Sequence, residues 1–308
     1  MDERTLLQVT VDGERRAYPA GTPYRQIAAD VQNRYENDIL LVDREGRLCE
    51  LHKQLDRDCA LKMVTAADKA GMQTYERSAV FLMLKALCDV AGRENVERVC
   101  VDFSLSRALF VRARGAFSLT QALLDQVAAR MRALSDQAAP IVKSSVSTDD
   151  AIRFFRETQM LDKARLLEYR LPSRVHIYTL DGFSDYFYGY VVPDAGYVKW
   201  FALELYEDGF VLRLPDQRQP RQVGAFTPSA KVFRALYDAT LRSEALHVTN
   251  VGELNETVSR GGATQMILTQ EALMEKQIGD IAQEIAGRRD VRFVMIAGPS
   301  SSGKTTFS

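Results

Sequence analysis

Apolar and polar residues alternate in the first part of the chain in the way that short, half-buried strands require. Residues 6–18 alternate on both sides of Asp12-Gly13, a dipeptide typical of a two-residue hairpin turn. A Thr-Pro pair then predicts the start of a helix over residues 23–34. The next short apolar runs are residues 39–42, 48–51 and 60–65. This order of hairpin, helix and short strands predicts a small β-grasp domain over residues 1–66.

The middle of the chain shows helical spacing in some stretches and strand-like alternation in others. Apolar residues step by three and four over residues 75–90 and again over 119–134, which predicts two amphipathic helices. Strands are predicted at residues 96–103, 107–113, 141–146, 175–180, 186–192, 198–206 and 210–214. The pattern predicts an α+β domain with antiparallel pairing over residues 67–225.

Many aromatic residues lie in the later strands: Phe183, Tyr186, Phe187, Tyr188, Tyr190, Tyr197, Trp200, Phe201 and Tyr206. One interpretation is a stacking surface for nucleic-acid bases or a nucleoside. The other is the core of a sheet with tyrosines at its rim. We favour the second, because only Arg174, Lys199 and Arg213 lie nearby to supply the positive charge that nucleic-acid binding requires.

The last part of the chain begins with a linker that is rich in proline, glutamine and arginine, at residues 215–228. Three helices are then predicted, which makes residues 226–290 a helical connector. Residues 291–297 are apolar without a polar face, as in a strand that is buried on both sides of a parallel sheet. The sequence therefore predicts that an α/β domain begins at residue 291.

A phosphate-binding pattern, G-x-x-x-x-G-K-T, follows this apolar run. Its two glycines let main-chain N–H groups approach phosphate oxygens. Lys304 is the candidate catalytic residue, because its ammonium would neutralise charge on the β- and γ-phosphates, and the Thr305 hydroxyl would ligate Mg²⁺. The candidate residues for binding ATP are Gly298, Ser300, Ser301, Ser302, Gly303, Lys304, Thr305 and Thr306. Residues 291–308 thus read as the first strand and loop of a P-loop domain, with the rest of its active site expected beyond Ser308.

Composition narrows the possible classes of protein. The 308 residues carry a net charge of −1, so no overall basic field argues for nucleic acid or for an anionic membrane. No apolar run approaches the roughly 20 residues of a membrane span, and the N-terminus does not resemble a signal peptide. The four cysteines and three histidines lack the spacing of metal ligands or disulfide scaffolds. These features predict a cytoplasmic protein with reduced thiols, and they do not indicate an oligomeric state.

Two stretches resemble parts of aminoacyl-tRNA synthetases. The segment VDGERRAYPAGTPYRQIA looks like the TGS domain, a ubiquitin-like recognition module of threonyl-tRNA synthetases. The segments ERSAVFLMLKAL and DYFYGYVVPDAG resemble the second additional domain of threonyl- and alanyl-tRNA synthetases, which hydrolyses mischarged tRNA. In that family, zinc is held by a His-x-x-x-His and a Cys-x-x-x-His. Those positions are Arg77, Phe81, Phe187 and Val191 in this chain. Because none of the four can bind zinc, we expect an inherited fold without zinc-dependent editing.

The order of these segments, ending in VRFVMIAGPSSSGKTTFS, is similar to bacterial uridine kinase-like proteins of the phosphoribulokinase/uridine kinase superfamily. This resemblance implies an ATP- and Mg-dependent nucleoside kinase that transfers phosphate to a nucleoside 5′-hydroxyl, with these 308 residues catalytically incomplete.

Two alternatives remain open. One is a module that faces tRNA or the ribosome and is coupled to an ATPase switch, which a lysine- or arginine-lined groove between the front domains would favour. The other is a regulatory region that senses a small ligand, which a closed apolar pocket near residues 186–200 would favour.

Overall fold

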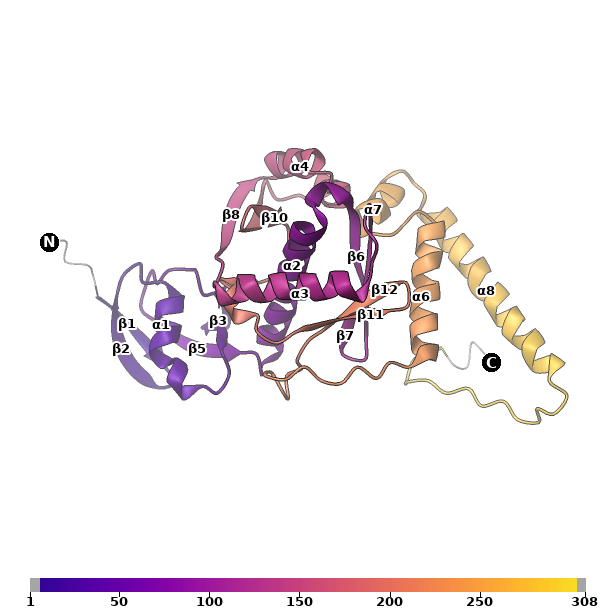
Figure 1. Cartoon of the computed structure of the whole chain (residues 1–308), viewed down its shortest axis with the longest axis horizontal. Helices are drawn as coiled ribbons and strands as arrows, with labels where there is room; N and C mark the ends of the chain where they lie inside the picture. The colour runs from indigo at the N-terminus through magenta and orange to yellow at the C-terminus, as the bar shows by residue number, and fades with distance from the viewer. Residues whose placement is uncertain (1–5, 304–308) are drawn as a thin grey trace.

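The computed structural model describes residues 6–303 and shows an α+β protein with several sheets (Figure 1). The first unit is a five-stranded mixed sheet in the order β2-β1-β5-β3-β4, in which only β1 and β5 run parallel. The predicted hairpin forms, because Asp12 and Gly13 take the positive φ angles of its tight turn. The elements are β1 (Leu6–Val11), β2 (Glu14–Pro19), α1 (Tyr24–Val31), η1 (Gln32–Arg34), β3 (Ile39–Arg44), β4 (Arg47–Glu50) and β5 (Cys59–Thr65).

The second unit holds two further sheets around the long helix α2. One sheet has the order β10-β9-β8 and the other β11-β12-β7-β6, with antiparallel pairing throughout. Helix α2 lies in the main core, and its Phe81, Leu82 and Met83 are fully buried there. The elements are α2 (Lys69–Ala91), η2 (Arg93–Asn95), β6 (Val96–Leu105), β7 (Ala108–Gly115), α3 (Gln121–Asp136), β8 (Ile141–Ser147), α4 (Thr148–Glu157), α5 (Leu161–Glu168), β9 (Arg174–Leu180), β10 (Phe183–Asp185), η3 (Ala195–Tyr197), β11 (Ala202–Tyr206) and β12 (Gly209–Arg213).

The first two units share a packed boundary. Leu40 of β3 and Ala66 belong to the same buried cluster as α2, so the apolar core continues from one unit into the other. Ion pairs also cross the boundary, among them Arg25–Asp194 at 2.9 Å and Lys199–Asp38 at 2.8 Å. Burial of apolar surface is the dominant stabilising contribution here, because partly exposed ion pairs add little.

The structure corrects the prediction of strands at residues 186–192 and 198–206, since residues 186–201 contain only the short helix η3 and a strand begins at Ala202. Apart from an isolated bridge between Asp194 and Pro140, just before β8, the backbone in this segment bonds largely to distant side chains. Arg77 Nη1 donates to the carbonyl of Tyr190 at 2.7 Å, and the amide of Val192 donates to Ser78 Oγ at 3.1 Å. Helix α2 therefore supplies hydrogen bonds that a sheet would otherwise provide.

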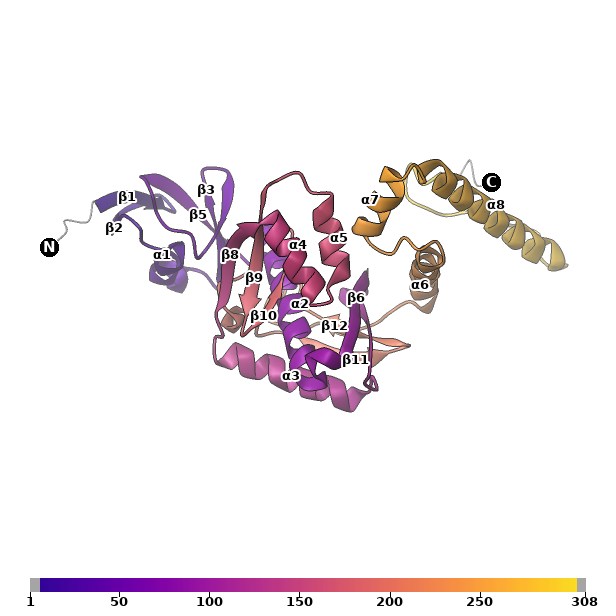
Figure 2. The ribbon, with the colours of Figure 1, turned by 90° about the horizontal axis from the view of Figure 1, so that it is seen from above.

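The helical connector forms as predicted, with three helices at the end of the molecule opposite the first unit (Figures 1 and 2). They are α6 (Ala230–Ala245), α7 (Val251–Ser259) and α8 (Ala263–Gly287). Phe233 is buried in α6 and Gly252 in α7, whereas α8 buries no residue within the described part of the chain. Across residues 6–303, none of the helices combines the length and the apolar composition that crossing a membrane requires.

The predicted strand at residues 291–297 is absent from the structure. These residues lie in irregular backbone, and Phe293 and Met295 are 88% and 93% exposed. A strand needs a neighbouring strand to pair its N–H and C=O groups, and within residues 6–303 every sheet is built from β1 to β12 alone. The apolar run therefore has no sheet here in which to be buried.

Candidate functional site

The first feature of interest is a buried carboxylate where the first two units meet. Glu50 is the last residue of β4 and is 0% exposed. Its carboxylate accepts hydrogen bonds from Lys143 Nζ at 2.5 Å, Tyr178 Oη at 2.6 Å and the amide of Val191 at 3.2 Å. All three donors belong to the second unit. A buried charge with this many partners fixes the relative position of the elements that hold it, because removing one partner would leave the charge uncompensated.

Basic side chains surround this carboxylate on the outside of the molecule. The register of β8 and β9 pairs Lys143 with Tyr178, Ser145 with His176 and Ser147 with Arg174, which places these residues on one face of the sheet. We call the basic residues of this region the seam surface: His52, Lys53, Lys143, Arg170, Arg174 and His176. His52, Arg174 and His176 are exposed, so this surface presents hydrogen-bond donors to solvent, and Arg174 adds an exposed positive charge.

The two histidines of the seam surface are held in their neutral form near neutral pH. Partial burial lowers the pKa of His52 and of His176, and the positive charges of Lys143 and Lys53 lower both further. The Glu50 carboxylate opposes this shift at both histidines without reversing it. Protonation below neutral pH would therefore add two positive charges to a surface that is already basic.

A cavity of about 510 Å³ lies elsewhere in the second unit, between β6, α2 and the connector. It contains an ion pair between Lys163 Nζ and Asp185 Oδ1, 3.2 Å apart. Asp185 is almost fully buried, and burial raises the pKa of its carboxyl, whereas Lys163 and the amide of Tyr186 act in the opposite direction. Polar and apolar groups both line the cavity, so it differs from the closed apolar pocket that a purely hydrophobic ligand would need.

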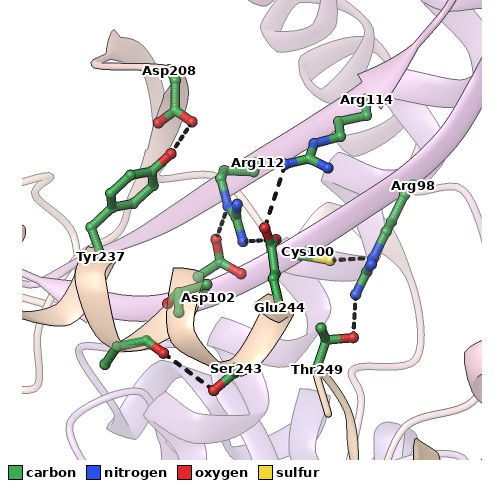
Figure 3. A network of polar contacts seen from close by, with 12 residues as sticks. Arg98, Cys100, Asp102, Arg112, Arg114, Asp208, Tyr237, Ser243, Glu244 and Thr249 are labelled. Carbon is green, nitrogen blue, oxygen red and sulfur yellow. Dashed lines mark hydrogen bonds and ion pairs between the residues drawn. The ribbon is translucent and has the colours of Figure 1, made fainter. Parts of the chain in front are cut away.

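One wall of this cavity is a polar network that joins the sheet to the connector (Figure 3). Arg112 of β7 donates through Nε to Asp102 of β6, and its Nη2 lies 2.9 Å from Glu244 Oε1 of α6. Arg98 Nη2 donates to Thr249 Oγ1 at 2.7 Å. The hydrogen bond to Asp102 is the largest influence on Arg112 and raises its pKa, so this guanidinium stays charged.

The structure brings together the positions at which the synthetase family holds zinc. Phe81 is fully buried, and its ring centroid lies 5.1 Å from that of Phe187. Val191 is buried beside them in the same core cluster, and Arg77 bonds to the neighbouring carbonyl of Tyr190. Across residues 6–303, no group of three or more His, Cys, Asp or Glu residues could hold a metal ion.

The predicted phosphate-binding loop is only partly within the described residues. Gly298 to Gly303 follow the exposed apolar run, and Ser301 and Gly303 have φ angles of 59° and 75°. Lys304, Thr305 and Thr306 lie outside the described residues. Their roles in binding phosphate and magnesium remain predictions from the motif.

Sequence reasoning missed the residues of the seam surface. They come from segments as far apart as His52 and His176, and no local pattern joins them. Glu50 lies in a stretch predicted to be a strand, and a glutamate in a strand is expected to face solvent. The one available signal was that two of the three histidines of the chain lie close to lysines or arginines in the sequence.

Comparison with known proteins shows similarity to threonine--tRNA ligases over about two thirds of the chain. It is 28% identical over 209 residues to the threonine--tRNA ligase of Symbiobacterium thermophilum, an alignment that covers 65% of this chain and 30% of the relative. For the threonine--tRNA ligases of Porphyromonas gingivalis and Halorhodospira halophila, identity is 26% over 201 residues and 23% over 236 residues, covering 63% and 76% of this chain. The alignments span only 30% and 36% of those two relatives. No family model matches the chain.

These relatives correct the prediction of function. The expectation of a uridine kinase-like nucleoside kinase is wrong, because the similar proteins are named as ligases for threonine and tRNA. The resemblance to threonyl-tRNA synthetases is supported over about 65% of the chain. The chain is thus an α+β protein that is similar to these ligases over about 65% of its length, and it spans about a third of the length of the relatives that it matches.

Proposed function

We propose that the front part of the chain is an RNA-facing module that engages tRNA. The observation that carries the proposal is the seam surface, where basic side chains from both units gather around the buried Glu50. The similarity to proteins named threonine--tRNA ligase supports tRNA as the class of RNA. Basic groups of this kind bind phosphate oxygens and position an RNA without reading its sequence.

The domain organisation is part of the same proposal. Residues 1–66 form a TGS-like β-grasp domain, and residues 67–225 form a domain like the second additional domain of the synthetases. Residues 226–290 connect it to the segment 291–308. Arg77, Phe81, Phe187 and Val191 occupy the four zinc positions, and the rings of Phe81 and Phe187 pack against each other there. The second domain would therefore hold RNA without zinc-dependent hydrolysis.

The phosphate-binding motif adds a nucleotide to the proposal. Gly298, Ser300, Ser301, Ser302 and Gly303 would cradle the phosphates of ATP together with Lys304, Thr305 and Thr306, and Thr305 would hold Mg²⁺. Binding or hydrolysis of ATP would then act as a switch on the RNA-facing part. The spacing of the motif supports the binding of ATP at this loop.

The experiment that tests RNA binding measures the affinity of the chain for a tRNA mixture by filter binding at several salt concentrations. The double variant Lys53→Gln/Arg174→Gln removes two positive charges of the seam surface, at the half-buried Lys53 and the exposed Arg174. We expect it to bind more weakly and to lower the slope of log K against log salt by about 2, since each phosphate contact contributes about 0.9 to that slope. Lys143 is left unchanged, because it neutralises Glu50.

The matched control is Arg15→Gln, which removes a positive charge from β2 at the opposite edge of the first sheet from β4. It should leave both the affinity and the salt slope unchanged. An equal loss of affinity in Arg15→Gln would mean that the net charge of the protein, rather than the seam surface, determines binding. No measurable tRNA binding by the unchanged chain would refute the proposal.

A further inference from the structure

Helix α6 is attached to the second unit by two different kinds of contact. Near its start, Phe233 packs against Phe110 and Tyr206, with ring centroids 5.2 and 5.0 Å apart. Tyr237, one turn later, stacks on Phe233 at 5.3 Å. We call these four residues the aromatic anchor. Buried aromatic groups of this size make a firm, mainly apolar attachment.

The end of α6 and the link to α7 are attached mainly by polar contacts, whereas Gly252 of α7 is buried and packs closely on α5. Residues 240–259, which we call the strap, comprise the end of α6, the link to α7 and α7 itself. Besides its bond to Arg112, Glu244 lies 3.8 Å from Arg114 of β7. On the other side, Arg165 Nη1 lies 3.3 Å from Glu253 Oε1, where α7 lies beside α5 (Figure 2). The pairs made by Arg114 and Arg165 are partly exposed and contribute little to stability, so the more buried Arg112–Glu244 pair is the main polar attachment of the strap.

The strap covers the cavity of about 510 Å³. It contributes Thr240, Ser243, Glu244, Val248, Thr249 and Asn250 to the lining, opposite α2 and β6. Beneath it, the Arg112 side chain is 7% exposed, and its Nη1 atom is buried without a hydrogen-bond partner among the described residues. A buried unpaired donor carries a free-energy cost that is relieved when water or a ligand oxygen reaches it. Closure therefore leaves one polar group unsatisfied inside the cavity.

We propose that the strap is a movable cover that opens and closes the cavity, with the aromatic anchor as its hinge and Glu244 as its latch. Opening breaks the bonds from Glu244 to Arg112 and Arg114 and lets an acceptor oxygen reach Arg112. Asp102 remains paired with Arg112 in the open state, so the guanidinium is never left without a counter-charge. This inference concerns the cavity, and it holds whether or not the seam surface binds RNA.

Two cysteines report on the cover, because Cys88 and Cys100 both line the cavity. Burial raises the pKa of each thiol, which slows its reaction while the cavity is closed. Cys49 and Cys59 are buried in the core of the first unit and serve as internal references. The rate at which a maleimide labels each cysteine in the native protein, resolved by peptide mass spectrometry, therefore distinguishes opening of the strap from global unfolding.

The test compares the unchanged chain with Glu244→Gln and Arg165→Gln, which weaken the strap from its two sides. We expect Cys88 and Cys100 to be labelled about two to five times faster in Arg165→Gln, the change in opening that loss of one partly exposed ion pair produces. The increase should be larger in Glu244→Gln, because its partner Arg112 is nearly buried. Cys49 and Cys59 should keep their rates. Asp238→Asn is the matched control, because it removes an exposed charge from α6 that has no ion pair among the described residues.

Three results would overturn the inference. Unchanged labelling of Cys88 and Cys100 in both variants would mean that the strap does not open. An equal increase at all four cysteines would show global unfolding instead of a local cover. An equal increase in the labelling of Cys88 and Cys100 in Asp238→Asn would show that the overall charge of α6, rather than the contact of Glu244, controls access to the cavity.

Discussion

Tyr178 of β9 and Glu50 of β4 meet across the boundary of the first two units, with the phenolic oxygen 2.6 Å from a carboxylate oxygen of Glu50. Both residues are buried, and the neighbouring carboxylate together with burial raises the pKa of Tyr178, so its hydroxyl stays protonated as a donor. The pair adds a polar contact between two units that also share the apolar cluster around Leu40 and Ala66. Its removal should therefore weaken the attachment between them.

The first prediction concerns this bond. Tyr178→Phe keeps the ring and removes the donor, which should lower the free energy of unfolding by about 1.5–3 kcal/mol, the usual contribution of a hydrogen bond to a charged group. Chemical denaturation followed by circular dichroism gives this quantity. Tyr188→Phe is the control, because Tyr188 is 85% exposed and should change stability very little. Equal stability of the two variants would contradict the proposed role of the bond.

The second prediction concerns pH. The folded state lowers the pKa of His52 and His176 below the ordinary value of about 6.5, so the unfolded chain binds protons more readily in this range. Stability should therefore be fully present above about pH 6.5 and should fall as the pH drops below that value. The variant His52→Gln/His176→Gln should flatten this part of the profile, as measured by denaturation between pH 5 and 8, roughly the range in which histidine titrates. An unchanged profile would assign the pH dependence to other groups.

Local patterns predicted much of this fold, and their failures have a common cause. The helix over residues 75–90 and the strands of β6 to β9 follow from periodicity, because apolar residues recur at the spacing of each element. The segment 186–201 has the composition of a strand, but Arg77 and Ser78 of α2 and the distant Glu50 take up its backbone groups. Contacts of this kind depend on residues more than 100 positions away, which no local pattern contains.

Local sequence patterns also fail to predict the candidate site. The resemblance to the synthetases is supported over about 65% of the chain, yet the seam surface arises only when β4 and β9 are brought together. The apolar run at residues 291–297 shows the opposite error. Its composition predicts a buried strand, but burial needs neighbouring strands, and among the described residues none pairs with it.

The third prediction compares two phenylalanines. Phe81 is fully buried between Phe183 and Phe187, so Phe81→Ala should leave a cavity and lower the free energy of unfolding by about 3–5 kcal/mol. Phe293→Ala makes the same chemical change where the side chain is 88% exposed, and it should have little effect. Chemical denaturation of both variants provides the comparison. A large loss in Phe293→Ala would show that residues 291–297 are packed after all.

The fourth prediction tests the phosphate-binding motif. Lys304→Ala removes the ammonium expected to contact the β- and γ-phosphates, and affinity for ATP with Mg²⁺ should fall about 10- to 100-fold, the range for one charge-assisted hydrogen bond. Isothermal titration measures this affinity directly. Lys276→Ala removes a lysine of α8 outside the motif and should leave the affinity unchanged. ATP binding that is insensitive to Lys304 would remove the nucleotide from the proposal.

The fifth prediction concerns the start of α2, where the chain passes from the first unit to the second. A Cβ on Gly71 would lie 1.9 Å from the carbonyl oxygen of Thr65, so Gly71→Ala must displace the backbone at the end of β5. Forced overpacking of this kind should cost about 1–3 kcal/mol of unfolding free energy or more. In Gly279→Ala, by contrast, the new methyl group meets nothing within 4 Å on α8, and the helix should gain about 0.5–1 kcal/mol, because alanine loses less conformational entropy than glycine. Thermal unfolding of the two variants should therefore shift in opposite directions. A neutral Gly71→Ala would show that the junction is loosely packed, and the shared core around Leu40 and Ala66 would then not hold the two units together.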